Sequence, residues 1–224
     1  MTACSAPVAA LLFDFGGTLD ADGVAWKERF HAFFAGGSLR PGEFDRAFYA
    51  ADDALVGAVA RDLSFRETVE QLSRNLVGRL GADPAIGPRI ADGFYQSSLA
   101  KVEASAQVLG RLAKRYRLGI VSNFYGNLEA ICEETGLGRH LSVVVDSACV
   151  GFEKPDPRIF ETALAALAAT PDSAIFVGDS LPRDMEGARR LGMRHVYVTP
   201  GGAAACCPED RVIGSVAELP EVLP

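Results

Sequence analysis

The sequence predicts an α/β fold in which a parallel sheet is interrupted, just after its first strand, by an all-helical insertion. Two observations predict it. Beyond residue 100, short apolar runs alternate with amphipathic helical patterns, as in parallel sheets whose helices cover both faces. Between residues 20 and 100 the patterns are helical throughout. We therefore expect a core of residues 1–20 and 100–224 and a helical domain of residues 21–99.

The first strand is expected at residues 8–15, where the apolar run VAALLFDF ends in a Gly-Gly-Thr turn. The helical insertion follows. In its first helix, aromatic residues recur at spacings of three and four and define one apolar face. The helices of the insertion are expected at residues 24–35, 41–60, 64–80 and 84–99.

The second half of the chain supplies the rest of the core. Strands are expected at residues 117–123, 141–146, 174–179 and 195–200, with helices at 104–116, 128–135, 157–169 and 182–191. Residues 211–223 are typical of one more short strand and a closing helix. The alternation predicts a Rossmann-like core of three layers, helix–sheet–helix.

Composition excludes several classes of protein. The 224 residues are 49% apolar and 23% charged, which is ordinary for a folded globular chain. The net charge is −7, and the chain has no run of basic residues that would track a phosphate backbone, so we expect no nucleic-acid partner. We expect no membrane partner either, because no apolar stretch reaches the length of a membrane span. The pattern does not indicate an oligomeric state.

The five cysteines are scattered, and no Cys-x-x-Cys motif occurs. Neither a disulfide framework nor a zinc ribbon is indicated, so we expect reduced thiols in a cytoplasmic protein. Residues 1–13 lack the basic start of a signal peptide. The adjacent Cys206 and Cys207 lie in a Gly/Ala-rich stretch that is typical of a surface loop, and their role stays open.

Chemically useful residues gather where the predicted strands end. Ligands bind at the carboxyl ends of the strands of an open parallel sheet, so these residues are expected to share one edge. The first strand ends in Asp14, followed by Gly16, Gly17 and Thr18, and the second ends in Ser122 and Asn123. Lys154 follows the third strand, and the fourth ends at Asp179, with Asp184 beyond it.

Carboxylates that lie close together need nearby positive charge to offset their repulsion. Two like charges about 5 Å apart repel by about 3 kcal/mol at an effective dielectric constant of 20. A divalent cation and the Lys154 ammonium would supply that positive charge, and ligands that are all oxygen favour Mg²⁺. Thr18, Ser122 and the backbone N–H groups of the Gly16-Gly17 turn suit an anion. The pattern predicts phosphoryl transfer onto Asp14.

The segments FDFGGTLD, VSN, GFEKPDPRIF and VGDSLPRDMEGARRLG resemble the four ordered motifs of the haloacid dehalogenase superfamily, and the insertion resembles that family's cap. The resemblance implies a hydrolase, most simply a phosphatase that acts on a small phosphorylated metabolite. It implies that Asp14 is the nucleophile, that Thr18 orients it, and that Lys154 neutralises charge. It implies phosphoryl contacts from Ser122, Asn123, Gly17 and Lys154, and Mg²⁺ ligands from Asp14, the Gly16 carbonyl, Asp179 and Asp184.

One position departs from the family pattern. Phosphatases of the family carry a general acid–base aspartate two residues after the nucleophile, and this chain has Gly16 there. Such assistance is typically worth about 10²- to 10⁴-fold in rate. Three interpretations stay open: a slow phosphatase, with Asp20 or Asp22 as a substitute acid; a dehalogenase or phosphonatase, for which Lys27 is the cap lysine to consider; and a catalytically weak phosphate-binding or regulatory protein.

The cap of this family selects the substrate. Candidate selectors here are Trp26, His31 and Arg40, and Tyr125 is expected at the mouth of the site.

Overall fold

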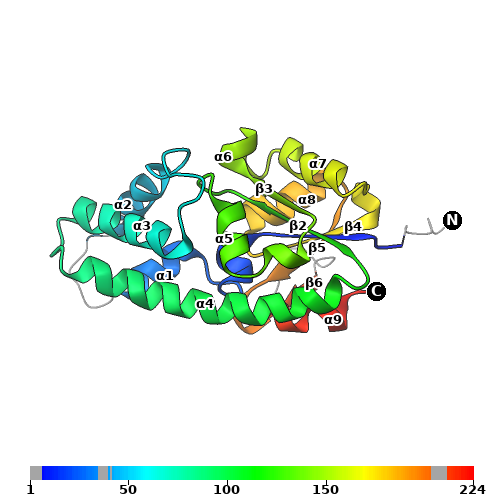
Figure 1. Ribbon diagram of the computed structural model, residues 1–224, viewed down its shortest axis with the longest axis horizontal. Coiled ribbons are helices and arrows are strands. Elements are labelled where there is room, and N and C mark those ends of the chain that lie inside the picture. Colours follow the sequence, from blue (N-terminus) through cyan, green and yellow to red (C-terminus); the bar gives the residue numbers. More distant parts are fainter. Residues whose placement is uncertain (1–6, 35–39, 41, 203–210) are drawn as a thin grey trace.

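The computed structural model describes residues 7–34, 40, 42–202 and 211–224. An α/β core occupies one half of the molecule and the helical cap extends from one end of it (Figure 1). All six strands of the core are parallel, in the order β3-β2-β1-β4-β5-β6. They are β1 Ala10–Phe13, β2 Arg117–Ser122, β3 Val143–Asp146, β4 Ala174–Gly178, β5 Arg194–Val198 and β6 Arg211–Ile213. The predicted α/β class and parallel sheet are confirmed.

Strand β1 lies at the centre of the sheet, between β2 and β4. Its last residue, Phe13, is in register with Ile120 of β2 and Val177 of β4. The chain order reverses here, because β2 and β3 extend the sheet on one side of β1 and β4 to β6 extend it on the other. This is the position at which open α/β sheets bind ligands. The residues after Phe13, Val121 and Val177 therefore reach one edge together.

Both faces of the sheet are buried under helices. Alternate residues of β1 point to opposite faces: Leu11 and Phe13 belong to one apolar cluster, and Ala10 and Leu12 to the other. Helices α4, α5 and α9 contribute to the first cluster, and α7 and α8 to the second. The bounds are α4 Ile86–Leu112, α5 Leu128–Glu134, α6 Ser147–Val150, α7 Pro157–Ala166, α8 Glu186–Arg190 and α9 Leu219–Val222.

The cap comprises α1 Trp26–Ala32, α2 Glu43–Asp53, α3 Phe65–Leu80 and the first part of α4. The predicted helix at 41–60 is too long, because the chain turns after Asp53 and Gly57 takes a left-handed φ of 65°. Helix α3 begins at a capping box formed by Ser64 and Glu67, which satisfies the free N–H groups of its first turn.

The two helices expected at 84–99 and 104–116 are a single helix of 27 residues, α4. Residues 100–103 contain neither glycine nor proline, so nothing in the chain interrupts the helical backbone. Figure 1 shows α4 running from the cap along the core. The boundary expected between residues 99 and 100 therefore falls inside a continuous helix.

No helix in the described part of the chain combines the length and the apolar character needed to cross a bilayer.

Candidate active site

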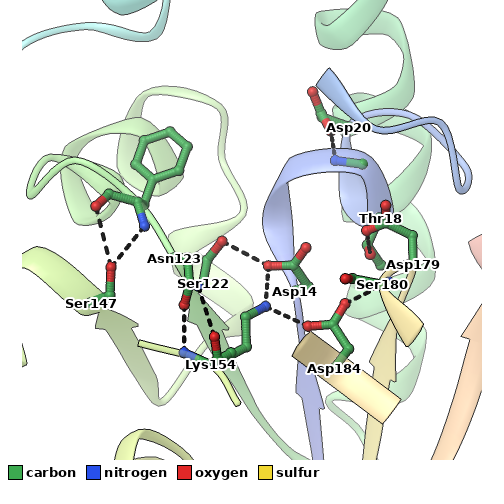
Figure 2. Close-up of polar contacts among 12 residues, drawn as sticks. Asp14, Thr18, Asp20, Ser122, Asn123, Ser147, Lys154, Asp179, Ser180 and Asp184 are labelled. Carbon is green, nitrogen blue, oxygen red and sulfur yellow. Dashed lines mark hydrogen bonds and ion pairs between the residues drawn. The ribbon is translucent and has the colours of Figure 1, made fainter. Parts of the chain in front are cut away.

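Three segments that are far apart in the sequence converge on Asp14, which directly follows β1. Its buried Oδ1 accepts a hydrogen bond from Ser122 Oγ at 2.7 Å and another from Lys154 Nζ at 2.6 Å (Figure 2). Ser122 ends β2, and Lys154 lies between α6 and α7. The predicted convergence at one sheet edge is therefore present.

Lys154 bridges two carboxylates. Besides Asp14, its ammonium pairs with Asp184 Oδ1 at 2.7 Å (Figure 2). Burial alone would lower the pKa of Lys154, but the carboxylates of Asp14 and Asp184 outweigh it and raise the pKa above its ordinary value. Lys154 therefore stays a cation between the two acids.

Two of the acids, Asp179 and Asp184, come from the segment that follows β4. Asp184 is fully buried, and its Oδ2 accepts the Ser180 N–H at 2.9 Å. Burial raises the pKa of Asp184 to about 6, against the opposing charge of Lys154. Burial, together with the charges of Asp14 and Asp184, also raises the pKa of Asp179 well above its ordinary value. Negative charge is therefore concentrated here beyond what Lys154 offsets.

The turn after Asp14 differs from expectation in two contacts. Thr18 was expected to orient Asp14, but its hydroxyl donates to Asp179 Oδ1 at 2.8 Å. The Gly17 N–H was expected to bind an anion, but it donates to Asp20 Oδ1 at 2.7 Å. Both donors are therefore hydrogen-bonded to acidic side chains, Gly17 to Asp20 and Thr18 to Asp179. Thr18 still belongs to the cluster, through Asp179.

Gly17 has a structural reason to be glycine. Its φ is 100°, and a Cβ atom there would lie 2.4 Å from Asp179 Oδ2. A side chain at this position would push Asp179 out of the cluster.

The acidic cluster fits a magnesium ion. One carboxylate oxygen from each of Asp14, Asp179 and Asp184 lies within 4.8 Å of the others. Hard oxygen donors at this density suit Mg²⁺, and the raised pKa values of Asp179 and Asp184 show that a further positive charge would be stabilising. Gly16 lines the same cavity, as its expected role as a carbonyl ligand requires.

Two polar side chains that were not expected at the site, Asp146 and Ser147, join Asn123 in holding the loop after β2. The Asn123 side chain donates to the Lys154 carbonyl at 3.1 Å and accepts the Lys154 N–H at 2.7 Å. Ser147 accepts the Phe124 N–H at 3.1 Å (Figure 2), and Asp146 accepts the N–H groups of Gly126 and Leu128. Asp146 ends β3 and Ser147 follows it at the same sheet edge, and that position is the signal from which these two residues could have been predicted.

Neither suggested substitute acid faces the site. Asp20 is fully buried and accepts hydrogen bonds from Trp26 Nε1 at 2.8 Å, Arg29 Nη1 at 2.7 Å and Ser98 Oγ at 3.1 Å, besides Gly17. It therefore joins the turn after Asp14 to cap helices α1 and α4. Asp22 pairs with Lys101 at 2.7 Å and accepts a hydrogen bond from Ser215. Among the described residues, the cavity wall includes neither acid.

A cavity of about 380 Å³ lies over Asp14, and residues of the cap form part of its wall. Trp26 and Tyr125 line it, as expected, whereas His31 packs against Phe44, and Arg40 is exposed and pairs with Glu43. Cys206 and Cys207 lie outside the described residues. The wall also contains residues that were not anticipated as part of the site, among them Glu28, Phe48, Tyr49, Asp52, Leu181 and Arg183.

Lys27 also lines the cavity, but its surroundings keep it charged. Its ammonium pairs with Asp45 at 3.4 Å and Glu28 at 3.7 Å. Although burial opposes them, these carboxylates and Tyr49 raise the pKa of Lys27. A lysine that forms a Schiff base must lose its proton, and these contacts favour the opposite state.

Comparisons with known proteins agree with this geometry. The haloacid dehalogenase-like hydrolase family matches residues 8–192. The bovine (Bos taurus) haloacid dehalogenase-like hydrolase domain-containing protein 3 is 41% identical over 98 residues, which cover 44% of this chain and 39% of that protein. Phosphoserine phosphatase from Thermus thermophilus is 32% identical over 145 residues, which cover 63% of this chain and 55% of the phosphatase. The chain thus spans two fifths to just over half of these relatives.

Among solved structures, the L-2-haloacid dehalogenase from Xanthobacter autotrophicus superposes with a TM-score of 0.58 at 19% identity, covering 96% of this chain and 98% of the dehalogenase. At that identity the likeness concerns the fold alone. The match over residues 8–192 includes every strand from β1 to β4 and each residue of the acidic cluster. The chain therefore belongs to the haloacid dehalogenase-like hydrolase family.

Proposed function

We propose that the protein is a magnesium-dependent phosphatase that hydrolyses a small phosphorylated metabolite through an aspartyl-phosphate on Asp14. One observation carries the proposal: Lys154 lies buried between Asp14 and Asp184, at 2.6 and 2.7 Å, beside the third carboxylate of Asp179. A buried cluster with three acids and one lysine is still short of positive charge. A divalent cation and a phosphate ester that binds with it would complete it.

Asp14, Asp179, Asp184 and the Gly16 carbonyl would hold the magnesium ion, which would neutralise phosphoryl charge when bound. Asp14 attacks phosphorus, while the Ser122 hydroxyl and the backbone N–H of Asn123 hold the phosphoryl oxygens. Lys154 offsets the charge on Asp14 and on the transferring group. Asn123 keeps Lys154 in place through its two hydrogen bonds to the Lys154 backbone. Water then attacks the aspartyl-phosphate and releases phosphate.

The size of the cavity supports a small substrate. About 380 Å³ is near the lower end of the range of ligand pockets, roughly 300–1,000 Å³. The similarity to an enzyme named phosphoserine phosphatase supports a phosphate monoester of that size.

Chemistry on carbon is the second candidate, because Gly16 replaces the acid and a dehalogenase shares the fold. The retained acidic cluster favours phosphorus, and the ion pairs of Lys27 disfavour a Schiff base.

Calorimetry with magnesium and beryllofluoride tests the proposal. We expect each ligand to tighten the binding of the other in the wild type, and Asp14→Asn to abolish this coupling. Asp22→Asn, a carboxylate outside the cavity, is the matched control and should bind as the wild type does. Hydrolysis of p-nitrophenyl phosphate should stop in EDTA, and mass spectrometry after acid quenching should find phosphate on Asp14. Unchanged ligand binding in Asp14→Asn, or activity that survives EDTA, would count against the proposal.

A further inference from the structure

The cap carries a carboxylate on the wall of the cavity in which Gly16 leaves the site without a general acid–base side chain. Asp52, the second-last residue of α2, lines the same cavity as Asp14 and Gly16. Its Oδ1 accepts a short hydrogen bond from the Tyr125 hydroxyl. Tyr125 lies three residues after Ser122, on the loop that leads from the end of β2.

The position of Asp52 is fixed from two sides. Besides the contact to its side chain, Tyr125 accepts the Gly57 N–H at its carbonyl oxygen, at 3.0 Å. Asp52 near the end of α2 and Gly57 in the turn that follows are therefore both hydrogen-bonded to Tyr125, on the loop that bears the phosphoryl-binding residues. Tyr125 itself is buried, so the contact is not a chance meeting of surface groups.

The other acids around the cavity belong either to the acidic cluster or to an ion pair. Within the described part of the chain, the carboxylates of its wall are Asp14, Glu28, Asp52, Asp179 and Asp184. Asp14, Asp179 and Asp184 form the acidic cluster. The side chain of Glu28 is 57% exposed and pairs with Lys27. Asp52 is half-buried, and its hydrogen-bond partner is a neutral phenol.

We infer that Asp52 is the general acid–base of the phosphatase reaction proposed above, supplied by the cap in place of an aspartate at position 16. This inference rests on the proposed function. A carboxyl group held by a phenol, without an ion pair, can gain and lose a proton as the reaction requires. Its second oxygen, Oδ2, is the atom that would carry that proton.

The proton balance closes over one turnover. As Asp14 forms its bond to phosphorus and the ester P–O bond breaks, protonated Asp52 gives its proton to the departing oxygen, which leaves as an alcohol. The Asp52 carboxylate then takes a proton from the water that attacks the aspartyl-phosphate. Phosphate leaves, Asp14 is regenerated, and Asp52 is protonated again.

The charges around Asp52 are consistent with this cycle. Burial raises the pKa of Asp52, and the charge of Asp53 adds to the rise, whereas the Tyr125 hydrogen bond and Arg183 oppose it. Burial, and then the charge of Asp52, raises the pKa of Tyr125 well above its ordinary value, so the phenol remains a donor. Above the pKa of Asp52 the acid is lost, so kcat/KM for an ester that needs protonation should fall as pH rises.

Leaving-group dependence is the test. An alkoxide must be protonated to leave, whereas p-nitrophenolate leaves without help. With magnesium present, Asp52→Asn should lower kcat/KM for glycerol 2-phosphate by at least about 10²-fold, and that for p-nitrophenyl phosphate by less than about tenfold. Asp53→Asn is the matched control: this exposed neighbour on the same helix does not line the cavity over Asp14, so on the acid side of the alkaline fall both rates should stay within about twofold.

The pH profile separates an acid from a substrate-binding group. Tyr125→Phe removes a hydrogen bond that lowers the pKa of Asp52, so the alkaline fall in kcat/KM for the alkyl ester should move to higher pH. Asp52→Asn should remove that fall.

The inference is overturned if Asp52→Asn slows both esters equally or neither, or if the alkaline limb is the same in all three proteins. If Asp14→Asn is inactive while Asp52→Asn is normal, Asp52 alone is misassigned. If the wild type hydrolyses neither ester and Asp14 is never phosphorylated, the proposed function fails and the role of Asp52 fails with it.

Discussion

The indole of Trp26 lies against Gly16, so that a Cβ atom at position 16 would come within 3.4 Å of the indole nitrogen. The backbone of Gly16, with φ of −75° and ψ of 108°, is one that any residue adopts. The backbone therefore allows a side chain at position 16, and its Cβ atom would touch the Trp26 indole at van der Waals distance. Trp26 is held in turn by its hydrogen bond to Asp20.

The first prediction concerns Gly16→Asp. A carboxyl group at position 16 should raise turnover of an alkyl phosphate by about tenfold and that of p-nitrophenyl phosphate by less, because only the alkoxide needs a proton. The gain should stay below the usual range because the indole restricts the side chain. Gly16→Asn meets the same indole without a proton to give, so it should show no selective gain. Equal gains in the two variants would show that the carboxyl does not reach the leaving group.

The second prediction concerns Asp20, which is buried against Arg29, whose side chain is only 12% exposed. Asp20→Asn leaves the guanidinium without its carboxylate and should lower the free energy of unfolding by about 3–5 kcal/mol. Asp22→Asn breaks a more exposed pair with Lys101 and should cost less than about 1 kcal/mol. Urea unfolding measures both. A smaller loss for Asp20→Asn than for Asp22→Asn would contradict the buried network.

The third prediction separates backbone strain from collision with Asp179. Gly17→Ala should abolish activity, because the new methyl group would lie 2.4 Å from Asp179 Oδ2. Gly57 also has a positive φ, but no atom lies within 4 Å of a Cβ there, so Gly57→Ala should cost about 1 kcal/mol of stability and keep its activity. Turnover of p-nitrophenyl phosphate and urea unfolding provide the comparison. An active Gly17→Ala enzyme would be inconsistent with the placement of Asp179.

The fourth prediction concerns the pH dependence of thiol alkylation. Burial raises the pKa of Cys132 to about 12, so below that pH it has almost no reactive thiolate, and iodoacetamide should not label it in the folded protein. Cys149 is exposed with a raised pKa, so its labelling should keep increasing above the pH at which an ordinary thiol levels off. Peptide mass spectrometry resolves the two sites, and concentrated urea should make both reactive. Native labelling of Cys132 as fast as that of Cys149 would contradict its burial.

The core could be predicted from the sequence because its signals are local. The apolar run that ends in Asp14 and the alternating segments after residue 100 each fix a strand, and parallel strands must deliver their ends to one edge. The meeting of Asp14, Ser122 and Asp179 follows from that rule. Contacts that depend on how an acid competes for a nearby donor, such as Gly17 with Asp20, do not.

The cap contribution could not be predicted in the same way. Asp52 is one of two adjacent acids on a helix, and only the packing of that helix over the core turns one of them toward Tyr125 and the cavity. The choice between Asp20 and Asp22 is similar, since the partners Trp26, Arg29 and Lys101 decide which way each carboxylate faces. No spacing along the chain encodes either result.

Helix α4 belongs to the cap and the core alike, and one apolar cluster extends from Phe44 and Phe65 in the cap to Leu11 and Leu118 in the sheet. If either part unfolds, it exposes the apolar interior of the other and breaks the backbone hydrogen bonds of α4, which the two parts share. Calorimetric heating should therefore give a single two-state melting peak rather than two. In thermodynamic terms the two halves are one cooperative unit, despite an outline that suggests two.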